Sequence, residues 1–188
     1  MGSFYVNLTV RTTNQMDVIA ALENRSAIIT SPQGGCIVVA DEEADKQNID
    51  DIRSLAQRLS LHVDAPVFAV LNHDDDILWY CLSRNGEIVD EYDSTPGYFE
   101  SGMDLSLPVG GNAKELCAAF GSSALNYVEE VLRKSSYNND GYAFAYDRHA
   151  ELAKVLGLPN FSVGFCFGGA SAGYLPEGLS EENLVRVR

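Results

Sequence analysis

Apolar positions are densest near the middle of the chain, where they predict three consecutive strands. Residues 66–71 and 77–82 are apolar at nearly every position, which is typical of strands buried on both faces of a sheet. A polar break of hairpin-loop length separates them, and Asn85-Gly86 then favours a two-residue type I′ turn. The third strand, residues 87–93, carries charges that suit a sheet edge. We therefore expect the first two strands at the centre of the sheet.

The N-terminal part predicts a regular alternation of strands and helices. Residues 4–10 alternate apolar and polar side chains, which indicates a strand with one buried face and one wet face. Asn14 and Asn48 are suited to begin two helices as N-caps, and short apolar runs at 26–30 and 36–40 flank a turn rich in Pro and Gly. The resulting β-α-β-β-α-β order is that of ferredoxin-like domains.

Strands that are apolar on both faces need a second covering layer, and the C-terminal part of the chain offers it. Three amphipathic helices are predicted at 112–120, 123–134 and 147–156. The predicted fold is therefore α+β, with a ferredoxin-like start, two additional antiparallel hairpin strands, and C-terminal helices on the second sheet face. Trp79 should lie buried between the sheet and these helices, so that its truncation to alanine would cost about 3 to 5 kcal/mol.

The length of 188 residues favours one domain over two. The linker between sheet and helices is longer than a compact fold usually needs, which makes it either functional or mobile. Residues 161–167 could add one more strand. The predicted divisions of the single domain 1–188 are a sheet-forming part 3–93, a crossing loop 94–111, a helical part 112–157, and a C-terminal strand and tail 158–188.

The net charge of the chain narrows the classes of partner that it can bind. Thirteen basic and 27 acidic side chains give a net charge of −14, and the acids concentrate in residues 41–51 and 74–93. Nucleic acid and anionic membranes would be repelled. The clusters indicate either a solvated surface that aids solubility or a docking face for a basic partner or a cation.

Cysteine use and hydropathy predict a cytoplasmic protein. The four cysteines are far apart, each beside apolar residues, and no C-x-x-C pair occurs, so we expect buried thiols in a reducing compartment. No apolar run reaches bilayer length, and the first residues do not resemble a secretory signal. No pattern in the sequence requires a cofactor, and the oligomeric state stays open.

Two stretches resemble a known group of proteins. The run LNHDDDILWYCLSRNGEIVDEYDSTPGYF at 71–99 and the run RHAELAKVLGLP at 148–159 are similar to an uncharacterised family of small acidic bacterial proteins. The resemblance implies a bacterial, cytoplasmic setting. No activity is assigned to that family, so the resemblance implies no site residues.

Two potential catalytic features are weak. Residues 169–173 match G-x-S-x-G, the nucleophile elbow of α/β-hydrolases, but that motif needs a helix directly after Ser171 and a later histidine. The sequence offers neither. Residues 174–178 cannot begin a long helix, and the three histidines, His62, His73 and His149, all come before Ser171. His149 shares a helix face with leucines, which favours a hydrogen-bonded core histidine over a catalytic base.

The leading hypothesis is a non-enzymatic binding protein with an acidic face for a basic partner protein, as in an immunity or inhibitor protein. The long loop should bring aromatic side chains beside the acidic hairpins, an arrangement suited to a cationic group. The predicted binding residues are Asp74, Asp75, Asp76, Asp90, Glu91, Asp93, Tyr98 and Phe99.

A metal-dependent enzyme is the alternative hypothesis. His73, Asp74 and Asp76 lie in one hairpin loop, and an imidazole with carboxylates suits Mg²⁺, Mn²⁺ or Ca²⁺. Adjacent residues on a turn diverge, however, so one loop seldom supplies more than two ligands. A solvated turn is the simpler interpretation of the same residues.

Overall fold

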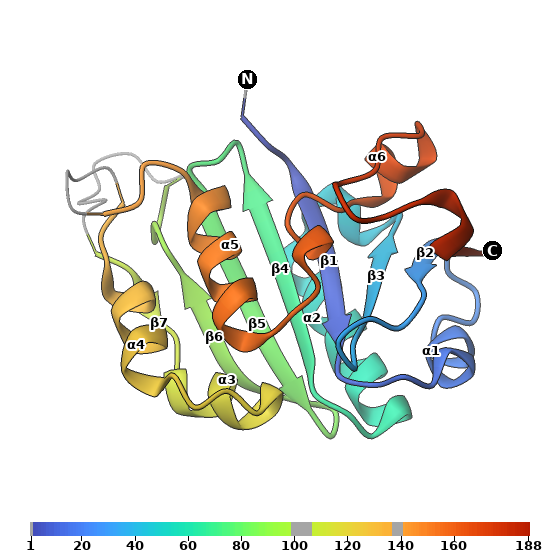
Figure 1. The fold of residues 1–188 in the computed structure, drawn as a ribbon, viewed down its shortest axis with the longest axis horizontal. Coiled ribbons are helices and arrows are strands. Elements are labelled where there is room, and N and C mark those ends of the chain that lie inside the picture. Colours follow the sequence, from blue (N-terminus) through green and yellow to red (C-terminus); the bar gives the residue numbers. More distant parts are fainter. Residues whose placement is uncertain (1, 99–106, 137–140) are drawn as a thin grey trace.

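An eight-stranded antiparallel sheet runs through the computed structural model, which describes residues 2–98, 107–136 and 141–188 (Figure 1). The strand order is β7-β6-β5-β4-β1-β3-β2-β8. The fold is thus α+β, with one more strand than the sequence predicted. The strands are β1 (Tyr5–Val10), β2 (Ala27–Thr30), β3 (Ile37–Asp41), β4 (Val67–His73), β5 (Ile77–Arg84), β6 (Glu87–Asp93), β7 (Val109–Gly110) and β8 (Leu184–Val187).

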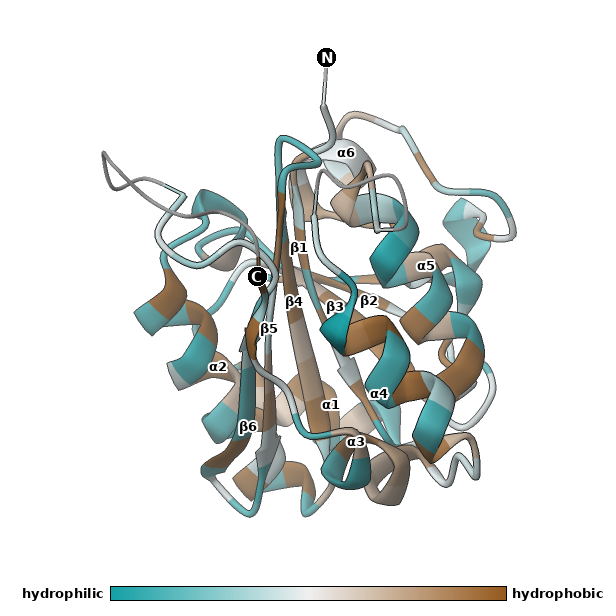
Figure 2. Cartoon of the chain, turned by 90° about the vertical axis from the view of Figure 1, so that its left-hand side faces the viewer, coloured by the Kyte–Doolittle hydropathy of each residue, from teal (hydrophilic) through white to brown (hydrophobic). Residues whose placement is uncertain are grey.

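Helices cover both faces of this sheet. Figure 2 shows the sheet nearly edge-on, with α2 on one side and α3, α4 and α5 on the other. None of the helices in the described ranges has the length and apolar character needed to cross a membrane. The α-helices are α1 (Gln15–Ala21), α2 (Ile49–Val63), α3 (Ala113–Phe120), α4 (Leu125–Arg133), α5 (Ala145–Leu156) and α6 (Phe167–Ser171), and short 3-10 helices lie at Ala44–Lys46, Asn160–Ser162 and Glu181–Asn183.

The helix boundaries follow the capping residues that the sequence predicted. The side chains of Asn14, Asn48 and Asn112 accept hydrogen bonds from backbone N–H groups at the starts of α1, α2 and α3. Gly121 and Gly157 adopt left-handed conformations just after α3 and α5, where a side chain would cost free energy. These helices share a hydrophobic core with one face of the sheet, which confirms the predicted cover on the second face.

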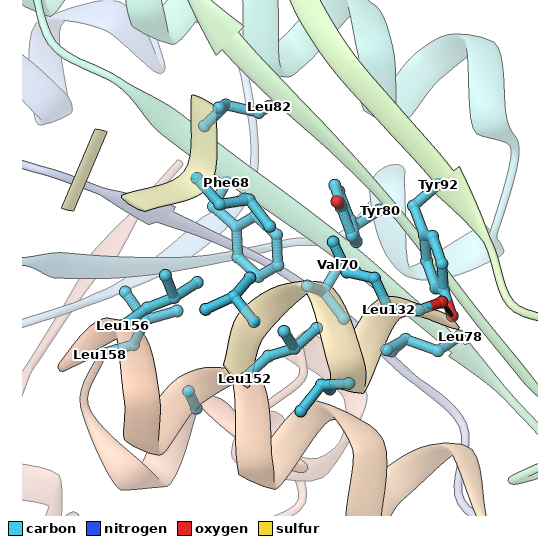
Figure 3. Packing of buried hydrophobic residues seen from close by; sticks show 14 of the residues in the cluster. Phe68, Val70, Leu78, Tyr80, Leu82, Tyr92, Leu132, Leu152, Leu156 and Leu158 are labelled. Atoms are coloured by element: carbon cyan, nitrogen blue, oxygen red, sulfur yellow. Dashed lines mark hydrogen bonds between the residues drawn. The ribbon is translucent and has the colours of Figure 1, made fainter. Parts of the chain in front are cut away.

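The two central strands present different residues to the two helical layers. On the face toward α3–α5, Phe68 and Val70 of β4 and Tyr80 of β5 pack with leucines of α4 and α5 (Figure 3). The alternate residues of the same strands, which include Trp79, pack with α1 and α2. Trp79 is buried, at 3% exposure, but the prediction that it faces the C-terminal helices is wrong. Because both faces of β5 are apolar, the sequence did not show which residues face which layer.

The prediction of a wet face on β1 is also wrong, because all six of its residues are buried. Asn7, a polar residue that the alternation placed in water, instead forms hydrogen bonds inside the protein through its amide nitrogen. The Asn7 amide donates hydrogen bonds to the carbonyl oxygens of Ser162 and Phe165, at 2.7 and 2.8 Å. The C-terminal segment therefore covers a strand face that we expected to be exposed.

The C-terminal strand lies later in the chain than predicted. Residues 161–167 form no strand: they include the end of a 3-10 helix and lead into α6. The strand is instead β8, whose residues Leu184–Val187 pair with β2 along one edge of the sheet. At the other edge, β7 pairs only with Tyr92 and Asp93. Most of β6 is thus an edge strand, as its charges predicted.

Both hairpins of the central strands have tight turns. Asn85 and Gly86 have φ values of 52° and 80°, which confirms the predicted type I′ turn. Asp74 and Asp75 also have positive φ values, of 54° and 61°, although neither is glycine. The Asp76 N–H closes this second turn by donating to the His73 carbonyl oxygen at 3.0 Å.

Candidate functional site

A pocket of about 370 Å³ lies where the start of α2 meets β4, β5 and the loop after β6. Its lining combines apolar and aromatic side chains with a few polar ones, which is the usual character of a ligand site. The two acidic stretches of the sequence meet here, since the segment before α2 forms one side and the two hairpin strands form another. The lining residues are Lys46, Gln47, Ile49, Leu71, His73, Ile77, Trp79, Asp93, Thr95, Gly97 and Tyr98.

Trp79 is held firmly in the pocket wall. Its indole Nε1 donates to Oε1 of Glu91 at 3.2 Å, and the guanidinium of Arg53 lies 5.6 Å from the ring centre. Arg53 also forms an ion pair with Glu91 through two hydrogen bonds. Glu91 is therefore a neutralised support for the tryptophan rather than an available anion.

Asp93 is the carboxylate that this network leaves uncompensated. It lies directly opposite Trp79 in the β5–β6 register, so both side chains reach the same face of the sheet. Its Oδ1 accepts the Thr95 N–H at 2.8 Å, and within the described ranges its Oδ2 accepts no hydrogen bond. Burial raises the pKa of this carboxyl group above its ordinary value, and the nearby Glu91 adds to the effect.

His73 joins the hairpin to the segment before α2. Its Nδ1 lies 2.6 Å from Oε1 of Gln47, while Nε2 of Gln47 donates to the Asn72 carbonyl oxygen at 2.9 Å. The ring of Phe4 meets the imidazole edge-on, with 4.9 Å between ring centres. These contacts fix the orientation of the imidazole at the pocket rim.

Tyr98 connects the loop after β6 to the acidic turn. Its hydroxyl donates to Oδ2 of Asp76 at 2.7 Å, and this hydrogen bond raises the pKa of the phenol. The Thr95 hydroxyl donates to the backbone oxygen of Asp76 at 2.9 Å. The start of the long loop therefore lies against the turn between β4 and β5, whereas the sequence predicted its aromatic residues to lie beside the acids of residues 90–93.

The structure separates the residues predicted for binding, and His73 of the metal alternative, into several environments. His73, Asp93 and Tyr98 line the pocket, and Asp76 bonds to Tyr98 beside it. Asp74 is exposed at the tip of the turn. The predicted residue Phe99 lies outside the described residues.

Two other predicted acids lie away from the pocket. Asp75 binds the N-terminal segment, accepting from the Ser3 N–H and hydroxyl at 3.0 and 3.1 Å. Asp90 accepts from the Tyr80 hydroxyl and from the Asn112 N–H, both at 2.8 Å, and burial raises its pKa. Alternation along β6 separates Asp90 from Glu91 and Asp93, so the predicted acids do not form one continuous face.

Sequence reasoning missed several pocket residues. Trp79 was predicted as core only, and Gln47 and Thr95 were not singled out. The register of the second hairpin offered a signal for the first of these, because counting outward from Asn85-Gly86 brings residues 79 and 93 near each other. No comparable local signal exists for Gln47, whose contacts join segments distant in sequence.

The other chemical candidates gain no support from the geometry. No group of three His, Cys, Asp or Glu residues that could hold a metal ion occurs within residues 2–98, 107–136 and 141–188. Ser171 is exposed at the end of the five-residue helix α6, so the G-x-S-x-G match is not a nucleophile elbow. His149 is buried and hydrogen-bonded to Tyr5, as a core histidine should be.

Comparisons with known proteins leave the pocket as the main guide to function. No protein-family model matches this chain, and neither a curated protein nor a solved structure does. The resemblance of residues 71–99 and 148–159 to small acidic bacterial proteins stays a prediction. Function is therefore argued below from the charge and shape of the site.

Proposed function

We propose that this chain is a non-enzymatic binding protein that holds a positively charged side chain of a basic partner protein in the pocket beside Asp93. The uncompensated carboxylate of Asp93 carries this proposal. It is partly desolvated, and within the described ranges its Oδ2 accepts no hydrogen bond. A lysine ammonium or arginine guanidinium would supply both the missing charge and the missing hydrogen bond.

The other charged groups around the pocket pair with one another, so the charge of Asp93 stays unbalanced. Lys46 is on the rim, but its Nζ forms an ion pair with Glu43 at 2.7 Å. Arg53 is paired with Glu91, as described above. The aromatic side chains of Trp79 and Tyr98 add surfaces that favour a cation. An anionic ligand would meet Asp93 directly, so a cation is the complementary ligand.

Tryptophan fluorescence gives a direct test of this proposal. The sequence contains one tryptophan, and Trp79 lines the pocket, so hexa-arginine should change its emission in a saturable manner. The Asp93→Asn variant should bind hexa-arginine roughly tenfold or more weakly, because it loses a charge-assisted hydrogen bond. Binding should also weaken as salt is added, since salt screens exposed charges.

Glu87→Gln is the matched control for Asp93→Asn. Glu87 is an exposed carboxylate at the opposite end of the same strand, so its removal changes the net charge equally without touching the pocket. If both variants weaken binding to the same extent, the attraction comes from overall charge and the proposed site is wrong. Hexa-glutamate should leave the Trp79 emission unchanged.

The metal-dependent enzyme is the alternative proposal, and thermal unfolding separates it from binding. After chelation, melts with Mg²⁺, Mn²⁺, Ca²⁺ and Zn²⁺ should show no upward shift if His73 and its neighbours bind no metal, because selective binding to the folded state raises the melting temperature. A clear shift with one ion, removed by His73→Ala, would favour the alternative.

The fold unit, the cellular location and the class of partner are also part of this proposal. We infer that β1 to β4 form a ferredoxin-like unit, which the strand order β4-β1-β3-β2 and its two helices support. A bacterial, cytoplasmic binding protein of the immunity or inhibitor type would fit an acidic chain with four free thiols. Nucleic acid is a poor partner for a chain with a net charge of −14.

A further inference from the structure

We infer that a second hollow, on the opposite face of the sheet, receives another basic side chain of the same partner. The recognised ligand is then an extended polypeptide segment with two separated arginine or lysine residues. This inference rests on the function proposed for the Asp93 pocket. The second hollow has a volume of about 450 Å³ and is lined by Ser3, Asp75, Phe144, Tyr146 and Asp147.

The turn between β4 and β5 connects the two hollows. Asp76, on one side of the turn, bonds to Tyr98 of the first pocket, and Asp75 lines the second hollow. The backbone oxygen of Asp75 accepts the Ala145 N–H at 2.6 Å, which ties the start of α5 to the turn. Figure 1 shows the start of α5 and this turn at the same end of the sheet. Both hollows therefore lie beside this turn, at the same end of the sheet but on its two faces.

The second hollow combines exposed aromatic rings with carboxylates. Phe144 and Tyr146 are 55% and 39% exposed, which leaves large apolar surfaces in water beside Asp75 and Asp147. An aromatic face and a carboxylate together favour a cation, through cation–π attraction and through charge. The Oδ1 atom of Asp75 is enclosed and has no hydrogen-bond partner within the described ranges, so the two hydrogen bonds from Ser3 leave the charge of this carboxylate only partly compensated.

Occupancy of both hollows requires two basic groups on one chain. The hollows lie on opposite faces of the sheet, so one side chain cannot reach both. After the first group has bound, a linker of suitable length holds the second at a high effective concentration. Affinity should therefore depend on the distance between the two basic residues and not only on their number.

Peptides of equal charge test this dependence. Each carries two arginines separated by a Gly-Ser spacer of increasing length, and a peptide with one arginine serves as the reference. We expect calorimetry to show an affinity maximum at one spacer length, about tenfold or more above the single-arginine peptide. An affinity that stays flat across all spacers would overturn the inference.

Phe144→Ser removes the second site while keeping the fold. Phe144 occupies the N-cap position of α5 without a side-chain capping bond, and serine is a better residue there. This variant should lose the spacer-dependent gain and keep both its affinity for the single-arginine peptide and the Trp79 signal. Leu125→Ser, which removes another exposed apolar side chain at the start of α4, should leave the gain unchanged.

The outcomes distinguish failure of this inference from failure of the proposed function. If Asp93→Asn abolishes binding of the single-arginine peptide but no spacer effect exists, the first pocket stands and the second site is wrong. If the single-arginine peptide does not bind at all, the proposed function fails as well. Spermine binding as tightly as the best peptide would contradict the assignment to a polypeptide segment.

Discussion

Replacing Arg148 by alanine should lower the free energy of unfolding by roughly 3 to 5 kcal/mol. The side chain is fully buried, and its Nη1 donates to the Tyr92 hydroxyl at 2.6 Å and to the Val131 carbonyl oxygen at 2.9 Å. Its Nη2 donates to the Ser135 carbonyl oxygen at 3.2 Å, and the guanidinium lies 4.5 Å from the ring centre of Tyr142. Truncation would leave buried acceptors unsatisfied and create a cavity.

Arg148→Met separates packing from hydrogen bonding in this cluster. Methionine fills much of the same volume and removes a buried cation that forms no ion pair in the described part of the chain. Since burial of such a charge is itself costly, we expect the methionine variant to lose clearly less stability than alanine in urea denaturation. Equal losses for both variants would show that the hydrogen bonds dominate.

Acidification should destabilise the protein through His149, by about 4 to 5 kcal/mol between pH 6.5 and pH 3. Burial lowers the pKa of this imidazole from 6.5 to about 3. Below pH 6.5 the unfolded chain therefore binds a proton that the native protein does not bind, and the free energy of unfolding falls by about 1.4 kcal/mol per pH unit. The stabilisation is fully present above pH 6.5 and is lost as the pH approaches 3.

A His149→Gln variant isolates this contribution from that of the carboxyl groups. Glutamine can accept a hydrogen bond from the Tyr5 hydroxyl, which lies 2.9 Å from Nδ1 of His149, but it does not titrate. In chemical denaturation from pH 7 to pH 4, the free energy of unfolding should fall more steeply with pH for the unmodified protein than for the variant. A constant difference would show that the native protein binds the proton as readily as the unfolded chain.

The features of this fold that depend on a few adjacent residues could mostly be predicted from the sequence. Asparagine caps and the glycines after α3 and α5 set the helix ends, and Asn85-Gly86 set one hairpin, because each depends on a few adjacent residues. The layer that Trp79 faces could not be predicted, since a strand that is apolar at every position has no distinctive face. β8 was missed because a strand of four residues carries little signal of its own and forms only through pairing with the distant β2.

The candidate site was predictable in part for the same reason. His73, Asp93 and Tyr98 were named from local patterns of acid, aromatic and turn residues, and the structure places them in one pocket. Gln47 and the second hollow depend on contacts between segments far apart in sequence, such as Asp75 with Ala145. Such contacts follow from the packing of whole layers, which residue spacing alone does not determine.

The pairing of β8 with β2 has a consequence for the folding kinetics. Ala27 lies opposite Val187 in this ladder. The two strands are neighbours in the sheet, but nearly the whole chain separates them in the sequence. Closing so long a loop costs entropy before the strand contacts compensate for it, and non-local pairing of this kind slows folding. We expect this edge to be acquired late, after β4 and β5 have formed their local hairpin.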